Sequence, residues 1–216
     1  MSARVFAAYA AHELRTPIAL QLALAEATLA DPHADTVAWR AMAEGIVAGC
    51  EQQRRLIDAL LDLSCSRHGL TRRAPVDLAA VAREALNGYD LSGLESVVAL
   101  EPAVTFGDPT MLERLAANLV SNAVRHNILD GRIELSTRTV SGCAVLSVAN
   151  TGPLIPAGEL PRLFQPFERL ASPRTRCADG VGLGLALVQS IADAHDATIG
   201  AHAPALGGLE IEVRFP

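Results

Sequence analysis

Apolar residues recur at helical spacing through the first third of the chain and predict two helices. In residues 4–29 the apolar positions lie three or four residues apart, as on one face of a helix. These positions are Leu14, Ile18, Leu22, Ala25 and Leu29. After a break at residues 31–35, a heptad stripe follows, made of Trp39, Met42, Ile46, Gly49, Gln53, Leu56, Leu60 and Leu63. Two helices joined by so short a loop predict an antiparallel hairpin.

The two apolar stripes are too long for either helix to bury its own stripe against the other alone. We therefore expect two hairpins to pair into a dimeric four-helix bundle, so that the protein forms a homodimer through the helical hairpin. The alternative is that the hairpin docks onto the rest of the same chain.

The pattern changes after residues 71–75, which have the composition of a linker. Helical periodicity is expected over residues 78–86, 108–126, 155–163 and 183–194, and strands over residues 97–100, 104–106, 133–137, 144–148, 197–201 and 209–215. The last strand alternates strictly, so one of its faces is exposed to water. Because strands and helices do not alternate as regular βαβ units, the pattern predicts an α+β sandwich, a mixed sheet with helices on one face.

Composition narrows the class of protein. The chain has 24 acidic and 18 basic side chains, a formal net charge of −6, and no Lys/Arg cluster dense enough for a nucleic-acid site. No apolar run reaches the roughly 18 residues of a membrane span. The cysteines lack metal-ligand spacing, so we expect reduced thiols of a cytosolic protein. They are Cys50, Cys65, Cys143 and Cys177.

Candidate chemistry begins in the first helix, in the sequence Ala-Ala-His-Glu-Leu-Arg-Thr-Pro at residues 10–17. His12 and Thr16 lie on one face of the helix, one turn apart. Pro17 cannot donate to the carbonyl of Glu13, so the helix leaves a polar backbone group open there. A titratable ring is thus presented from the side of a helix, beside a carboxylate that can act as a base.

A second group of residues favours phosphate binding. Gly180, Gly182 and Gly184 precede a helix, where backbone N–H groups and the helix N-terminus favour anions. Their spacing is neither that of a Walker loop nor that of a dinucleotide fingerprint. Asn118 and Asn122 share one face of an apolar helix. Amides there need partners, which a hydrated Mg²⁺ and a triphosphate would supply.

Five segments, in their order along the chain, together resemble the motifs of the sensor histidine kinases of two-component signalling. They are the phosphoacceptor box at residues 12–17, the first nucleotide-binding box at 118–127, the first glycine box at 150–153, the phenylalanine box at 163–167 and the second glycine box at 180–184. The resemblance covers nearly the whole chain. It implies a dimerisation and histidine-phosphotransfer hairpin over residues 1–69 and a catalytic ATP-binding domain of the Bergerat type over residues 72–216.

By this resemblance, His12 is the nucleophile that takes the γ-phosphoryl group of ATP and passes it to an aspartate of a response regulator. Glu13 accepts the other ring proton or stabilises the imidazolium as it forms. Glu13 and Thr16 also match the pair with which such kinases position water to dephosphorylate the partner's phosphoaspartate.

The resemblance also assigns roles to the residues expected to bind ATP and Mg²⁺, which we call the nucleotide end of the site. Asn122 is the expected Mg²⁺ ligand, Asn118 and Arg125 are expected to contact phosphates or metal-bound water, and His126 to lie near the sugar or the base. The triphosphate is held by three glycines, Gly180, Gly182 and Gly184. Residues 165–181 form a mobile lid whose candidate phosphate contacts are Arg169, Arg174 and Arg176.

Two positions depart from the family pattern. Asn150 stands where the family has an aspartate that accepts a hydrogen bond from the adenine amino group, two residues before Gly152, and Leu154 replaces a second glycine. The amide oxygen can still accept, but lost charge assistance costs on the order of 1 kcal/mol. We therefore expect weak ATP binding, in the high micromolar range or weaker, and tighter binding after Asn150→Asp. The alternative is a degenerate kinase that acts mainly as a phosphatase or scaffold.

The resemblance also implies partners and location. The expected partners are a second copy of the chain and the receiver domain of a response regulator, with no nucleic acid. A membrane is involved only through a sensor region absent from this chain, so we expect a cytoplasmic fragment of a membrane-anchored parent. Two other classes fit less well. Chaperone-like ATPases have Glu at the position of Asn118, and anti-sigma-type modules lack a phosphoacceptor hairpin of this length.

Overall fold

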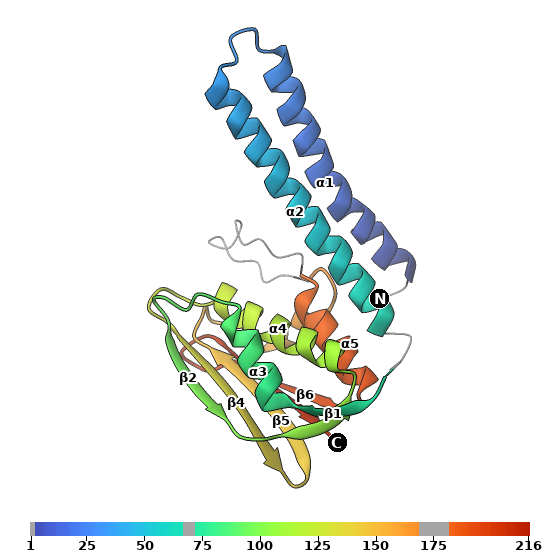
Figure 1. Cartoon of the computed structure of the whole chain (residues 1–216), viewed down its shortest axis with the longest axis vertical. Coiled ribbons are helices and arrows are strands. Elements are labelled where there is room, and N and C mark those ends of the chain that lie inside the picture. The colour runs from blue at the N-terminus through green and yellow to red at the C-terminus, as the bar shows by residue number, and fades with distance from the viewer. Residues whose placement is uncertain (1–2, 67–71, 169–181) are drawn as a thin grey trace. The chain divides into compact units, whose positions relative to one another are not determined.

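The chain folds into two compact units, Met1–Leu61 and Asp62–Pro216. The computed structural model describes residues 3–66, 72–168 and 182–216. Figure 1 shows the first unit as a pair of long helices, and the second as a sheet with helices along one face. Within the described residues, no helix has the length and apolar character that crossing a membrane requires. This architecture confirms the predicted helical hairpin followed by an α+β sandwich.

The first unit is an antiparallel hairpin of α1 (Ala3–Ala30) and α2 (Thr36–Ser66). Helix α1 runs without interruption through Pro17. At the turn, the carboxylate of Asp35 accepts a hydrogen bond from the backbone N–H of Ala38 at 2.9 Å, which satisfies a free donor at the start of α2. A carboxylate at this position therefore ends the loop and begins the second helix.

The two helices approach closely where α2 carries glycine. A Cβ atom at Gly49 would lie 2.3 Å from Nε2 of Gln21, and one at Gly45 would lie 3.2 Å from a methyl group of Leu24. In the space that Gly49 leaves, Nε2 of Gln21 donates to the carbonyl of Ile46 at 3.2 Å. Gln21 thus fixes the register of α1 on α2.

Most of the predicted α1 stripe is exposed, and of its five residues only Leu14 and Ala25 are half-buried. Ile18, Leu22 and Leu29 are 53%, 57% and 70% exposed, whereas the predicted α2 stripe contributes half-buried residues such as Met42 and Ile46. The hairpin therefore keeps a second apolar face that its own packing leaves uncovered.

The second unit is a five-stranded mixed sheet in the order β2-β4-β5-β7-β6, with a separate antiparallel pair β1-β3. Strands β2 and β4 are parallel, and the remaining pairs are antiparallel. The strands are β1 (Ala74–Asp77), β2 (Glu95–Leu100), β3 (Val104–Gly107), β4 (Arg132–Val140), β5 (Cys143–Asn150), β6 (Thr198–His202) and β7 (Leu209–Phe215). The helices are α3 (Leu78–Asn87), α4 (Pro109–Arg125), α5 (Gly184–Ala194) and a short 3-10 helix, η1 (Ala157–Phe164).

The core lies between the sheet and the helices that cover one of its faces (Figure 1). Strand β7 shows the alternation most clearly, because its odd-numbered residues from Leu209 to Phe215 are buried and Glu210 and Arg214 are exposed. The predicted wet face is therefore confirmed. The largest fully buried side chains include Leu112, Leu115, Leu119, Ile133, Leu135, Leu146, Ile191 and Phe215.

One buried polar side chain, His195, ties the end of α5 to the start of α4. The ring is 3% exposed; its Nδ1 lies 2.8 Å from the carbonyl of Ile191 and its Nε2 accepts from the backbone N–H of Asp108 at 3.0 Å. A carbonyl only accepts and an N–H only donates, so the ring must be neutral and protonated at Nδ1. Burial lowers the pKa of His195 below its ordinary value.

His195 should make the stability of the second unit depend on pH. Above about pH 6.5 the ring is neutral in both the folded and the unfolded chain, and the stabilisation is fully present. As the pH falls below that value, His195 becomes protonated in the unfolded chain but stays neutral in the folded chain. The free energy of unfolding therefore decreases. Urea unfolding followed by circular dichroism at pH 7.5 and 5.5 should show a loss of about 1 kcal/mol that His195→Gln abolishes.

His202→Gln is the matched control, because His202 is exposed on β6. This variant should keep the pH response of the original chain. An unchanged pH response in His195→Gln would contradict the assignment of the effect to His195.

Candidate functional site

Helix α4 is the element on which the second unit's candidate residues converge. Asp108 caps the helix, accepting hydrogen bonds from the backbone N–H groups of Thr110 at 3.0 Å and Met111 at 3.3 Å. The apolar face of α4 is buried against the sheet. Asn118 and Asn122 lie one turn apart and are half-buried. The sequence prediction of two amides on one helical face is therefore consistent with their placement.

Asn118 brings the start of α5 to the middle of α4. Its Nδ2 donates to the carbonyl of Arg114 at 2.8 Å. Its Oδ1 lies only 3.0 Å from the place where a Cβ atom would stand at Gly184. Glycine at the first residue of α5 therefore lets the helix N-terminus, with its free N–H groups, approach the amide of α4.

Gly152 brings the turn after β5 to the other end of α4. A Cβ atom on Gly152 would lie 2.8 Å from the carbonyl oxygen of His126, which follows the helix. Gly207 and Gly208, which have φ of +96° and +98°, also pack against this turn. A Cβ atom at Gly208 would lie 2.0 Å from the carbonyl oxygen of Asn150. Two glycine segments thus approach α4: the start of α5, at Gly184, lies against its middle, and the turn at Gly152 lies against its C-terminal end.

Gly207 and Gly208 are functional-site neighbours that the sequence reading missed. Their signal was two adjacent glycines directly before a strictly alternating strand. Such a pair marks a turn with positive φ, but the sequence does not say which other turn it packs against.

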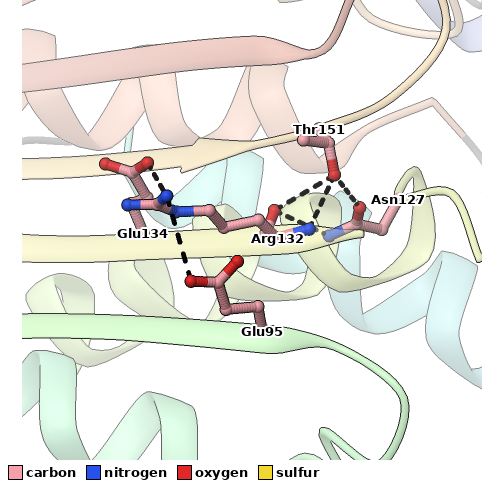
Figure 2. Close-up of polar contacts among 5 residues, drawn as sticks. All are labelled: Glu95, Asn127, Arg132, Glu134 and Thr151. Atoms are coloured by element: carbon pink, nitrogen blue, oxygen red, sulfur yellow. Dashed lines mark hydrogen bonds and ion pairs between the residues drawn. The ribbon is translucent and has the colours of Figure 1, made fainter. Parts of the chain in front are cut away.

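Asn127 and Thr151 lie within two of the predicted boxes but were given no role of their own, and they join the loop after α4 to the strands (Figure 2). Thr151 Oγ1 donates to Oδ1 of Asn127 at 2.6 Å and accepts from the backbone N–H of Arg132 at 2.7 Å. Asn127 Nδ2 in turn donates to the carbonyl of Arg132 at 3.1 Å. We call these three residues, Asn127, Arg132 and Thr151, the latch. It fixes where the turn that contains Asn150 meets α4.

Asn150 is the last residue of β5 and is 8% exposed. It continues the inward row of Leu146 and Val148, so its side chain lies on the helix side of the sheet. Its Nδ2 donates to the carbonyl of Thr151 at 2.6 Å. The amide nitrogen is thus engaged by the turn, and the oxygen is the end directed away from that carbonyl.

The other residues predicted to bind the nucleotide belong to the end of α4 and to the segment before α5. Arg125 and His126 are exposed at the end of α4. Gly182 has a φ of +73°, and its carbonyl accepts a hydrogen bond from the N–H of Phe167 at 2.8 Å. Leu154 is 72% exposed and does not adopt a positive φ. Gly180, Arg169, Arg174 and Arg176, with most of the predicted lid, lie outside the described residues.

The phosphoacceptor candidates belong to the first unit. His12 and Thr16 are exposed on α1, and Glu13 is half-buried. Thr16 Oγ1 donates to the carbonyl of His12 at 3.2 Å, which places the hydroxyl on the helical turn that carries the imidazole. Pro17 follows directly, so the carbonyl of Glu13 has no helical N–H partner at that position.

The donor chemistry of the nucleotide end suits a triphosphate with a hard cation. Among the described side chains there is no group of three or more His, Cys, Asp or Glu residues that could hold a metal ion by itself. Mg²⁺ needs few protein ligands, because it keeps several waters and shares phosphate oxygens, so one amide oxygen such as that of Asn122 suffices. Gly152 and Gly184 are half-buried, so part of their backbone remains exposed to such a ligand.

Comparisons with known proteins agree with this geometry. Residues 107–216 match the family "Histidine kinase-, DNA gyrase B-, and HSP90-like ATPase", and residues 2–69 match the "His Kinase A (phospho-acceptor) domain". Sensor protein CutS of Streptomyces coelicolor is 42% identical over 216 residues, which cover 98% of this chain and 52% of CutS. The chain thus spans about half the length of this relative.

Solved structures of histidine kinases have a similar fold. The mycobacterial sensor histidine kinase MprB is 28% identical with a TM-score of 0.60, over 67% of this chain and 97% of that one. The histidine kinase ThkA, solved in complex with the response regulator protein TrrA, is 20% identical with a TM-score of 0.74, over 98% of this chain and 60% of that one, and shows the fold alone. The chain therefore belongs to the sensor histidine kinases, with a phospho-acceptor domain followed by an ATP-binding domain of the Bergerat type.

Proposed function

We propose that this chain transfers the γ-phosphoryl group of ATP to its own His12 and then to an aspartate of a response regulator. One observation carries the proposal: α4 contacts both glycine segments, at Gly152 and at Gly184, in a chain that also presents His12 on an exposed helix turn. In this proposal residues 1–69 act as the phosphotransfer domain and residues 72–216 as the catalytic domain.

The nucleotide end supplies positioning and charge neutralisation, which carry most of phosphoryl transfer. Backbone N–H groups of Gly180, Gly182 and Gly184 hold the triphosphate. The base lies at Asn150 and Gly152, and His126 lies near the sugar or the base. Asn118 and Arg125 contact phosphate or metal-bound water. Mg²⁺, held by the amide oxygen of Asn122, would neutralise charge on the phosphates when bound.

The transfer step uses the neutral imidazole of His12. A ring nitrogen attacks the γ-phosphorus, a P–N bond forms, and the bond from phosphorus to the bridging oxygen breaks, so that ADP leaves. Glu13 accepts the proton of the other ring nitrogen or stabilises the imidazolium while it exists. In the second transfer a carboxylate oxygen of the receiver aspartate attacks the same phosphorus. A P–O bond forms, the P–N bond breaks, and the imidazole of His12 is released in its neutral form.

The same helical turn also serves the phosphatase reaction, in which water removes the phosphoryl group from the response regulator. Thr16 lies one turn from His12, and its hydroxyl already engages the His12 carbonyl. With Glu13, this hydroxyl can position a water for attack on the phosphoaspartate of the partner. Phosphatase activity is therefore proposed at the site that also makes the phosphohistidine.

A second candidate function, a weakly ATP-binding kinase acting mainly as phosphatase or scaffold, is favoured by the neutral side chain at Asn150 and by Leu154. Both changes fall at the base end of the site. The Glu13–Thr16 pair does not depend on them, so loss of nucleotide affinity would spare the phosphatase reaction.

We propose a homodimer as the working form and a receiver domain as the partner. The uncovered apolar face of the hairpin, with Ile18, Leu22 and Leu29, supports the dimer. The complex of ThkA with the response regulator TrrA supports the partner class. Because CutS is about twice as long, we propose that this chain is the cytoplasmic part of a longer, membrane-anchored sensor.

His12 should be the only residue labelled from ATP. Incubation of the chain with γ-labelled ATP and Mg²⁺ should give label that is lost in acid and stable in base, as expected for a phosphoramidate. His12→Ala should abolish the label, because it removes the nucleophile. His33→Ala, in the exposed turn between α1 and α2, is the matched control and should be labelled normally. Label that persists in His12→Ala would contradict the assignment.

Asn150→Asp should tighten ATP binding about fivefold, because a carboxylate accepts from the adenine amino group with charge assistance worth on the order of 1 kcal/mol. The carboxylate must turn away from the Thr151 carbonyl, to which the amide nitrogen donates in the original chain. Isothermal titration of Mg-ATP, expected to give a dissociation constant in the high micromolar range for the original chain, measures the change. Asn87→Asp adds the same charge at the exposed end of α3 and should bind ATP like the original chain. Equal affinity for Asn150→Asp would place the base elsewhere.

Light scattering after gel filtration should give the mass of two 22.7 kDa chains. Leu22→Glu should shift the mass towards one chain, because it places a charge in the middle of the proposed interface. Leu206→Glu changes a leucine that is 98% exposed on the second unit and should leave the dimer intact. A monomeric original chain, or a dimer in Leu22→Glu, argues against this interface.

A further inference from the structure

We infer that the latch sets the base selectivity of the nucleotide site, by fixing which end of the Asn150 amide faces the base. The inference deepens the proposed function and rests on it, because it concerns the nucleotide that would phosphorylate His12. Thr151 and Asn127 are positioning residues in this account, and Asn150 is the residue that contacts the base.

Thr151 is held through both its backbone N–H and its side-chain hydroxyl. Its backbone N–H donates to the carbonyl of Arg132 at 3.0 Å, and its hydroxyl donates to Asn127 at 2.6 Å and accepts from the N–H of Arg132 at 2.7 Å. The side chain and backbone of Thr151 therefore bond to two different elements, the end of α4 and the start of β4 (Figure 2).

The latch is also closely packed. A Cβ atom at Gly131 would lie 2.1 Å from Oδ1 of Asn127 and 2.5 Å from Oγ1 of Thr151. Glycine at this position lets the three-residue cluster close directly, without room for a side chain beside it. These bonds fix the side chain and the preceding peptide of Thr151. The carbonyl of Thr151 belongs to the following peptide, which is held by the close packing of Gly152, where a Cβ atom would lie 2.8 Å from the carbonyl oxygen of His126.

The held carbonyl then orients the amide of Asn150. Nδ2 of Asn150 lies 2.6 Å from the Thr151 carbonyl oxygen. If the amide were turned over, two oxygen acceptors would meet at that distance, which is unfavourable in a side chain that is only 8% exposed. The latch thus keeps the nitrogen on the backbone and presents the oxygen.

An amide oxygen accepts but cannot donate, so it matches the 6-amino group of adenine and opposes the 6-oxo group of hypoxanthine or guanine. A free asparagine amide could serve either base by exchanging its two ends. The latch removes that choice. A neutral side chain can then select adenine as a carboxylate would, with a weaker hydrogen bond.

The experiment compares Mg-ATP with Mg-ITP, whose base carries a 6-oxo group, by titration calorimetry on the whole chain. Three proteins are measured: the original chain, Thr151→Val and Thr151→Ser. Valine has the shape of threonine without the hydroxyl, and serine restores the hydroxyl. Inorganic tripolyphosphate, which has no base, reports on the phosphate half of the site and should bind all three proteins alike.

The original chain and Thr151→Ser should favour ATP over ITP by about tenfold. Thr151→Val should lower that preference to about twofold or less, with tripolyphosphate affinity unchanged, because the amide of Asn150 can then turn over. An undiminished preference in Thr151→Val, or equal binding of ATP and ITP by the original chain, would overturn the inference alone. A chain that binds neither nucleotide would overturn the proposed function together with it.

Discussion

The close approach of two glycine segments to α4 is the constraint on which the second unit depends. The helix buries its apolar face in the core, so only its other side can meet a ligand. On that side, a Cβ atom at Gly152 would lie 2.8 Å from the carbonyl oxygen of His126, and one at Gly184 would lie 3.0 Å from the amide oxygen of Asn118. A larger residue at Gly152 would displace the turn after β5, and one at Gly184 would push against the Asn118 side chain. The candidate nucleotide site therefore depends more on how closely these backbone segments approach α4 than on charged side chains.

The position of Asn150 follows from strand geometry. Inward residues of β5 are apolar as far as Val148, and the next inward position, at the end of the strand, is Asn150. A polar group there is buried but adjoins the turn, so it needs a partner from the chain, and the Thr151 carbonyl provides one. The amide of Asn150 can donate to the carbonyl of its own turn. An aspartate at this position could not, because a carboxylate has no donor.

Periodicity predicted the hairpin, the mixed sheet and the one-sided helices, because those depend on local patterns of apolar residues. The motif order predicted that residues 118–122 and 150–152 share a site. The latch could not be predicted, since Asn127 and Thr151 meet only through the register of β4 on β5. The same holds for His195, which sequence reasoning passed over and which bonds to Asp108 across 87 positions. Long-range polar pairs carry no periodic signal in a single sequence.

A crystal structure of the chain with Mg²⁺ and a non-hydrolysable ATP analogue would show where the base, the triphosphate and the metal ion bind. We expect the adenine amino group within hydrogen-bond distance of the Asn150 amide oxygen, the triphosphate at the start of α5, and the metal ion on Asn122. Adenine bound away from the β5 turn, or a triphosphate that does not contact the residues before α5, would contradict this expectation.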